Sequence, residues 1–285
     1  MPGLVDLVGR SFGPHPVDVT PSRVRDLVAA VGDDDTRWET HVPPYFANAV
    51  LFAAAPSFLE DEAVRPFTRA LIHSEQSFTW YRPLVTGDAL DVLGRVESVR
   101  ARGPLHLVSF AVEAESGDGP WITGSSLFLM SAEAAGEPDE APEPPTALRP
   151  PVDPMPAAPL PLPGERLATL RVGASRADLL EYASASGDWN PIHWDHRAAR
   201  AAGLPGTIVH GLLMSAWMIR AASRLAPGPR PLATMRARFR SPLRPGIGAE
   251  LGGSVLAVED DGAEIDLTLG SGGDSMVTAR VRVTR

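Results

Sequence analysis

Two segments of the chain, residues 20–32 and 175–187, share one pattern of polar and apolar positions. Each begins with a hydroxyl residue that can cap a helix, continues with apolar residues at helical spacing, and ends at a glycine suited to the left-handed C-cap. The distance from cap to glycine is twelve residues in both segments, and an aspartate follows each glycine, Asp33 or Asp188. The pattern predicts two equivalent helices, each followed by a polar loop.

The order of the later elements repeats as well. A long apolar run follows each loop, over residues 46–58 and 208–222, and predicts a buried helix. Each run precedes segments of alternating apolar and polar residues separated by turn signals, which predict antiparallel strands. The sequence P-L-x-x-G recurs at matching places, residues 83–87 and 242–246. We interpret the chain as two copies of one structural plan.

Between the copies, residues 138–163 hold 11 prolines among 26 residues. Proline lacks the backbone N–H that a helix or a central strand needs, so this stretch predicts a semi-extended linker. We therefore predict an N-terminal domain over residues 1–134, a linker over 135–165 and a C-terminal domain over 166–285.

Composition narrows the class of protein. The net charge of −9 argues against a general nucleic-acid-binding protein, and the absence of cysteine removes disulfides and thiolate chemistry. No signal-peptide-like segment or uncharged apolar run of membrane-spanning length is present, so we expect a cytoplasmic protein with no membrane partner.

The candidate chemistry lies after the second capped helix. Asp188 and His193 are five residues apart, and the intervening Asn190-Pro191 step disfavours helix, so both side chains could converge on one water. The apolar run that begins at Ile208 opens with unpaired backbone N–H groups, which can polarise a carbonyl oxygen. Reversible addition of water to an α,β-unsaturated thioester requires such an acid/base pair and oxyanion site.

The sequence S-G-D-W-N-P-I-H-W-D at 186–195, followed by G-T-I-V-H-G-L-L-M at 206–214, resembles the hydratase motif of MaoC-like (R)-specific enoyl-CoA hydratases and 3-hydroxyacyl dehydratases. The first copy resembles the N-terminal dehydratase domain often fused to this family. The resemblance implies an α+β double hotdog, in which two antiparallel sheets each wrap around a long central helix. It also implies a lyase in which Asp188 and His193 are catalytic, Asn190 orders the loop and the Gly211 amide is an oxyanion donor. The expected substrate is an acyl-CoA or an acyl carrier protein thioester, in fatty-acid or polyketide metabolism, without a further cofactor.

The two copies differ where chemistry is concerned. Five residues beyond Asp33 stands Trp38 rather than histidine, and Pro43-Pro44 replaces the His-Gly pair at the helix entry. Because proline has no N–H to offer, we predict one working site per chain, in the second half. The first half then supplies scaffold and part of the acyl channel, although an unexpected partner could still activate Asp33.

Other residues near the motif have two interpretations. His193, Asp195, His196 and His210 invite a metal site, but no H-E-x-x-H-like spacing exists and the family's chemistry uses no metal, so we expect none. We interpret Asp195 as a helix N-cap and His210 as structural. Trp189 and Trp194 either wall the pocket or pack in the core.

Three arginines, Arg236, Arg238 and Arg240, alternate with apolar residues on a predicted strand and so share one face. They are candidates for contacts with the phosphates of coenzyme A or phosphopantetheine. The alternative is an ordinary solvated strand face.

Two alternative functions remain at this point. The first is a thioesterase, because hotdog proteins include thioesterases in which a carboxylate activates water against the same carbonyl. The second is a non-catalytic acyl-binding subunit. Acyl chain length, the carrier and the direction of the reaction stay open, and so does a homodimer of the pseudo-dimeric chain.

Overall fold

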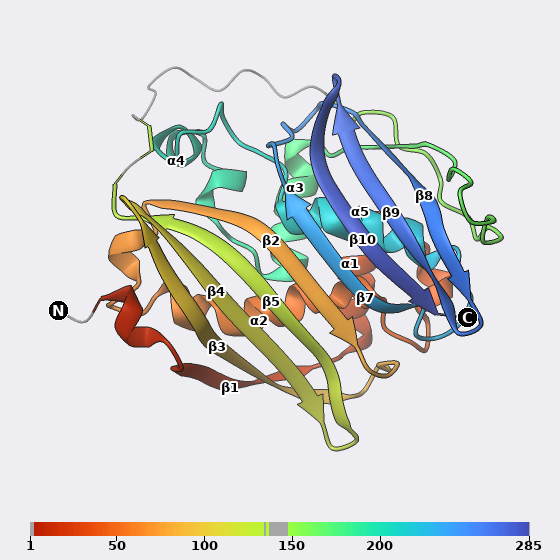
Figure 1. The fold of residues 1–285 in the computed structure, drawn as a ribbon, viewed down its shortest axis with the longest axis horizontal. Coiled ribbons are helices and arrows are strands. Elements are labelled where there is room, and N and C mark those ends of the chain that lie inside the picture. Colours follow the sequence, from red (N-terminus) through yellow and green to blue (C-terminus); the bar gives the residue numbers. More distant parts are fainter. Residues whose placement is uncertain (1–2, 134, 137–147, 285) are drawn as a thin grey trace.

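The computed structural model describes residues 3–133, 135–136 and 148–284, and its strands form one antiparallel ten-stranded sheet (Figure 1). The strands of the first half are β1 (Ser11–Asp18), β2 (Ala70–Trp80), β3 (Ala89–Arg102), β4 (Leu105–Ser116) and β5 (Gly119–Ser131). Those of the second half are β6 (Leu170–Val172), β7 (Leu232–Phe239), β8 (Ala249–Glu259), β9 (Gly262–Ser271) and β10 (Asp274–Thr284).

The strand order confirms the predicted repeat. The first half runs β1-β3-β4-β5-β2, and the second half, taken from its own outer edge, runs β6-β8-β9-β10-β7. The halves meet where β2 pairs antiparallel with β7, with Ser77 opposite Arg236. Two copies of the same five-stranded unit thus join edge to edge, which protects one edge of each from solvent.

The short helices begin and end as their caps predict. In α1 (Pro21–Val31) the Thr20 side chain accepts a hydrogen bond from the N–H of Arg23, and the C-cap Gly32 has φ +75°. The helix α3 (Arg176–Ser186) has a complete capping box between Ser175 and Asp178. The two helices pack against each other, which places their C-terminal loops between the halves.

The long helices α2 (Ala47–Leu59) and α5 (Gly211–Ser223) lie on the same side of the sheet, behind it in Figure 1. Every residue of α5 from Leu212 to Ser223 is buried, as the central helix of a hotdog requires. The helix begins at Gly211 and not at Ile208, where the apolar run begins. The reason is that Ile208 and Val209 are tied as extended backbone, donating their N–H groups to the carbonyls of Ile192 and Leu243.

The two P-L-x-x-G sequences form equivalent loops. Leu84 and Leu243 are both about 1% exposed, and each backbone carbonyl accepts a hydrogen bond of 2.8 Å from the segment that enters the long helix, from Val42 or Val209. The loop therefore fixes the position of the helix entry in each half.

The proline-rich segment lies partly outside the described residues, which omit 137–147. Residues 148–162 form no helix or strand and run along the second half, where the N–H of Ala158 donates to the carbonyl of Arg224. The domain boundaries at 134 and 166 stay predictions. None of the helices in the described part of the chain is both long and apolar enough to cross a membrane.

Candidate active site

Asp188 is held at the end of α3 by a tight turn. Gly187 has φ +84°, a conformation that favours glycine, and a Cβ there would lie 3.3 Å from that of Phe52 in α2. The N–H of Asp188 donates to the Ser186 hydroxyl, and one carboxylate oxygen of Asp188 accepts the N–H of Asn190. The second carboxylate oxygen is directed to His193.

His193 comes from a short 3₁₀ turn, Pro191–His193, that Asn190 caps. The Asn190 side-chain oxygen accepts the N–H of Ile192, which agrees with its predicted role in ordering the loop. His193 Nδ1 lies 2.9 Å from the carbonyl oxygen of Ile208. Because a carbonyl can only accept, Nδ1 carries the proton, and the lone pair of the neutral ring is on Nε2.

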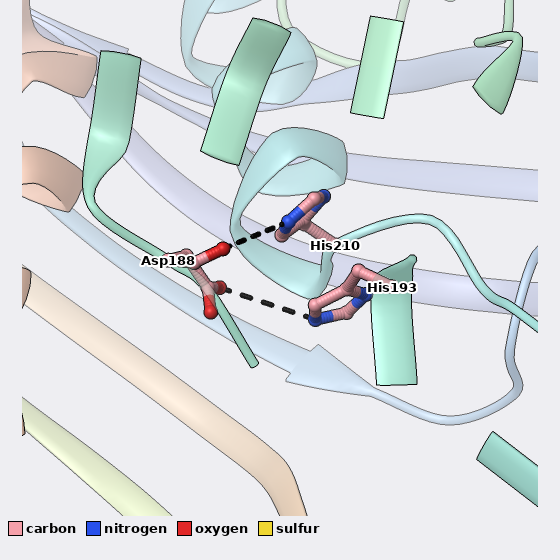
Figure 2. Close-up of side chains that lie close together, drawn as sticks. All are labelled: Asp188, His193 and His210. Atoms are coloured by element: carbon pink, nitrogen blue, oxygen red, sulfur yellow. Dashed lines mark hydrogen bonds and ion pairs between the residues drawn. The ribbon is translucent and has the colours of Figure 1, made fainter. Parts of the chain in front are cut away.

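Asp188 Oδ2 and His193 Nε2 are 4.0 Å apart (Figure 2). This separation is too long for a direct hydrogen bond, but an oxygen atom between them can reach both. The prediction that the two side chains converge on one point is therefore met by the geometry.

Both groups are buried, each about 6% exposed, and burial opposes their charged forms. Burial raises the pKa of Asp188 to about 7, against a smaller opposing effect of the Asn190 N–H. Burial lowers the pKa of His193 to about 4, against the Ile208 hydrogen bond. Near pH 6 the pair therefore consists of a protonated carboxyl group and a neutral imidazole.

His210 completes the cluster, a contact that the sequence did not reveal. Its ring stacks on His193 with centroids 3.8 Å apart, and its Nε2–H donates to the backbone carbonyl of Asp188 at 3.2 Å. Burial, with a contribution from His193, holds the pKa of His210 well below its usual range. The sequence places His210 immediately before the glycine that begins α5, and this position alone indicated a structural role.

Gly211 is the first residue of α5, so its backbone N–H has no acceptor within the helix. Gly211 lines the same cavity as Asp188 and His193. A Cβ at this position would lie 3.3 Å from the Phe239 ring, so glycine also permits the close approach of β7. The placement is compatible with the oxyanion role that the resemblance implies for the Gly211 amide.

A cavity of about 740 Å³ reaches the cluster and is lined by both halves of the chain. The second half supplies the loop 187–193, the α5 entry and the end of β7. The first half contributes six apolar and three polar side chains: Phe52, Pro56, Leu59, Leu71, Ile72 and Phe128, together with Glu60, Thr68 and His73. Phe52 lines the cavity, whereas Tyr45 and Phe46 are buried in the core.

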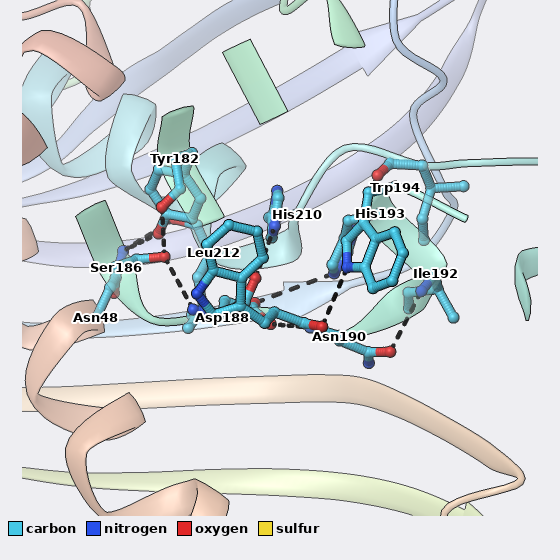
Figure 3. A network of polar contacts seen from close by, with 12 residues as sticks. Asn48, Tyr182, Ser186, Asp188, Asn190, Ile192, His193, Trp194, His210 and Leu212 are labelled. Carbon is cyan, nitrogen blue, oxygen red and sulfur yellow. Dashed lines mark hydrogen bonds and ion pairs between the residues drawn. The ribbon is translucent and has the colours of Figure 1, made fainter. Parts of the chain in front are cut away.

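A buried network supports the loop from the first half (Figure 3). Asn48 in α2 donates to the Tyr182 hydroxyl at 3.2 Å and to the Leu212 carbonyl, in the first turn of α5, at 2.9 Å. The Ser186 hydroxyl donates to the Tyr182 carbonyl and accepts from Asp188. Asn48 lies 134 residues from Tyr182, and nothing local in the sequence indicates this contact.

The cluster does not favour a metal ion, although ligand atoms of Asp188, His193 and His210 all lie within 4.8 Å of one another. The two imidazole rings are nearly parallel, 24° apart, and a nitrogen lone pair lies in the plane of its ring. Lone pairs in stacked planes do not converge on one ion at the roughly 2.0–2.1 Å that zinc requires. Outside this cluster, Asp195 caps α4 (His196–Ala201), as predicted.

The two tryptophans of the motif are not core residues. Trp189 is 52% exposed at the rim of the cavity, and Trp194 is 42% exposed and does not line it. The Trp194 indole N–H donates to the carbonyl of Trp189, so it braces the outside of the loop.

The three arginines share a face but differ in partners. Arg236 and Arg238 both form ion pairs with Glu75 on β2, at 2.7 and 3.2 Å. Arg240 lies just beyond β7, donates to the Thr278 hydroxyl and lines the cavity. Of the three, Arg240 is therefore the one that borders the site.

Comparisons with known proteins agree with this arrangement. The family model described as MaoC like domain matches residues 159–268, and that of the FAS1-like, dehydratase domain region matches residues 6–123. The 3-hydroxyacyl-thioester dehydratase X of Mycobacterium tuberculosis is 26% identical over 99% of this chain and 92% of its own length. A mitochondrial 3-hydroxyacyl-[acyl-carrier-protein] dehydratase of Arabidopsis thaliana is 40% identical, over 33% of this chain and 55% of its own.

Solved structures share the fold across the whole chain. A MaoC-like dehydratase superposes with a TM-score of 0.82 at 22% identity, covering 97% of this chain and 98% of the other. A Mycobacterium tuberculosis protein described as a double hotdog has a TM-score of 0.67 at 14% identity, covering 97% of this chain and 96% of the other. The chain has the double-hotdog fold, with a second half that matches the MaoC like domain family over residues 159–268 and a first half that matches the FAS1-like, dehydratase domain region family over residues 6–123.

Proposed function

We propose that this chain is a hydratase/dehydratase that interconverts trans-2-enoyl and (R)-3-hydroxyacyl thioesters. The observation that carries the proposal is the pair formed by Asp188 Oδ2 and His193 Nε2, 4.0 Å apart and buried beside a large, mainly apolar cavity. Gly211 lines the same cavity, and the relative that matches 99% of this chain is named a 3-hydroxyacyl-thioester dehydratase.

In the dehydration direction, the thioester carbonyl accepts a hydrogen bond from the Gly211 N–H, near the positive end of the α5 dipole. His193 Nε2 removes the proton from C2, because its lone pair is free while Nδ1 is bonded to Ile208. The electrons of the C2–H bond form the C2=C3 double bond as the C3–O bond breaks.

The leaving hydroxyl takes the proton of the Asp188 carboxyl group and departs as water. A proton then passes from His193 back to Asp188 across their 4.0 Å separation, through the intervening water, and restores both groups. Because acid and base lie on the same side of the substrate, the elimination is syn, and hydration is the same path reversed. The raised pKa of Asp188 keeps it protonated, as a general acid requires.

The experiment is loss of the conjugated enoyl-thioester absorbance when the purified protein is added to trans-2-enoyl-CoA substrates of four to twelve carbons at pH 6. We expect hydration, with a product oxidised by an (R)-specific and not by an (S)-specific 3-hydroxyacyl dehydrogenase. Release of free thiol without a hydroxyacyl product would identify a thioesterase instead. Failure with every chain length, as CoA and as carrier-protein thioesters, would leave only acyl binding.

Contact with the carrier's phosphates is proposed for Arg240 and not for its two neighbours. Glu75 forms ion pairs with both Arg236 and Arg238, whereas Arg240 lines the cavity and forms no ion pair among the described residues. We expect Arg240→Ala to raise the KM for an enoyl-CoA several-fold and Arg238→Ala to leave it unchanged. An N-acetylcysteamine thioester, which lacks the phosphates, should show no difference between the two variants. A KM increase in Arg238→Ala alone would reverse the assignment.

A further inference from the structure

His210 stands between the two loops of the site and contacts both. Its ring lies against His193 on one side, at 3.8 Å and 24°, and near the Tyr182 ring of α3 at 5.0 Å and 59°. It is fully buried, and its Nε2–H is bonded to the Asp188 carbonyl. The His210 side chain thus contacts the backbone carbonyl of Asp188 and the imidazole ring of His193.

The position of His210 makes this use of its side chain unusual. His210 is the N-cap of α5, where Ser, Thr, Asp or Asn normally accepts a hydrogen bond from the first turn, yet its side chain makes no capping bond. The side chain turns toward Asp188 instead, and Nδ1 has no hydrogen-bond partner among the described residues. A residue that departs from local preference in this way is expected at a functional position.

We propose that His210 is a positioning residue for the reaction, which clamps the Asp188 backbone and the His193 ring to the start of α5. The clamp keeps the carboxyl group, the imidazole and the Gly211 N–H in one geometry. The effect of the clamp on turnover rests on the proposed function, whereas the contacts of His210 with Asp188 and His193 are present in the structure. A misplacement of about 1 Å at such a site can lower a rate by about 100-fold.

The charges around His210 agree with this role. The titratable groups that face it are His193 from the 3₁₀ turn, Asp188 from its loop and Tyr182 from α3. With Nε2 donating to a carbonyl and the ring buried against a second imidazole, His210 stays neutral. It can therefore orient the pair without competing for the transferred proton.

The experiment uses two substitutions with opposite properties in the full chain. His210→Phe keeps a ring against His193 but removes the N–H, whereas His210→Gln keeps an N–H donor and removes the ring. We expect kcat of His210→Phe to fall about 10- to 100-fold with KM changed less than about twofold, and His210→Gln to recover most of the loss. His106→Phe is the matched control, because His106 is a partly buried histidine in the first half whose ring contacts Phe67.

Three kinetic results would overturn the positioning role. They are a change in KM alone, a kcat of His210→Phe within twofold of wild type, and equal losses of kcat in both variants. A second measurement does not depend on turnover: hydrogen exchange of the Asn190 amide, which is bonded to the Asp188 carboxylate. The clamp predicts faster exchange in His210→Phe and near-native exchange in His210→Gln. Unchanged exchange of the Asn190 amide in His210→Phe would also overturn the positioning role. If exchange is faster in His210→Phe but the wild-type protein is inactive on every thioester, only the proposed function fails.

Discussion

Asp33 and Asp188 occupy the same place in the two halves, immediately after the glycine that ends a capped helix, yet their surroundings are opposite. Asp188 accepts one backbone N–H, faces a neutral imidazole at 4.0 Å and borders the large cavity. Its carboxyl group is buried without a counter-ion among the described residues, which raises its pKa to about 7.

Asp33, in contrast, is fully engaged. Its Oδ2 accepts the Trp38 indole N–H at 2.9 Å and the Tyr45 hydroxyl at 3.0 Å. Its Oδ1 accepts from Arg220 at 3.0 Å in a buried ion pair that joins α5 of the second half to the first-half loop. Trp38 stands five residues after Asp33, as His193 does after Asp188.

The surroundings of each carboxylate determine whether it has a structural role or is available for chemistry. A carboxylate whose oxygens are all occupied by donors and a guanidinium stabilises the contact between the halves, but it has no free position for a substrate. A carboxylate left without a counter-ion costs stability and is available for proton transfer. The partner of Asp33 in the second half is Arg220, which occupies the carboxylate and does not activate it, and this supports a single working site.

The largest expected difference is in activity. Asp188→Asn removes the proposed acid and should lower enoyl-CoA hydration by about 10²- to 10⁴-fold. Asp33→Asn, the matched substitution in the other half, should leave kcat within about threefold, measured at a temperature where both variants are folded. Comparable losses in the two variants would show that the first half takes part in the chemistry.

The second difference is in stability, where the two substitutions should act in opposite directions. Asp33→Asn leaves the Arg220 guanidinium buried without its counter-ion and should lower the free energy of unfolding by about 3 kcal/mol. Asp188→Asn removes a carboxyl group whose pKa rises on folding from 3.8 to about 7. Between these values the folded state binds more protons than the unfolded state, so the wild type loses stability as pH increases.

Asp188→Asn should therefore raise the free energy of unfolding at pH 8 by up to about 4 kcal/mol, and the gain should shrink toward pH 4. Urea unfolding of both variants at pH 5 and pH 8 measures this. A destabilised Asp188→Asn at pH 8 would mean that the carboxylate has a favourable partner in the folded protein, and the contrast between the two aspartates would fail.

Local signals in the sequence are sufficient to predict the helices of both halves and the loop that carries Asp188 and His193. The caps at Thr20 and Ser175, the glycines that end both helices and the repeated P-L-x-x-G each act over a few residues, so they can be recognised one at a time. The spacing of Asp188 and His193 likewise placed both on one short loop. The start of α5 was missed by three residues, because the extended backbone before it is held by distant carbonyls.

The contacts that distinguish the two aspartates act over long distances in the chain. Arg220 lies 187 residues from Asp33, and Asn48 lies 164 residues from Leu212. Such pairs depend on how β2 and β7 join the halves, and a single sequence has no periodicity that indicates them. The stacking of His210 on His193 also depends on the fold, since the two rings come from different segments.

The smallest expected effect tests whether the Asp-x₄-His spacing alone is sufficient for activity. Trp38→His restores that spacing in the first half, and in an Asp188→Asn background any first-half activity would be measured without the second. We expect no gain beyond twofold in enoyl-CoA hydration, for two reasons. Arg220 still occupies Asp33 Oδ1, and Pro43-Pro44 offers no N–H at the helix entry to stabilise an oxyanion. Adding Arg220→Met removes the ion pair from Asp33 and leaves the missing N–H in place. Activity that appears only in this variant would attribute the inactivity of the first half to the ion pair, whereas continued inactivity would attribute it to the missing N–H.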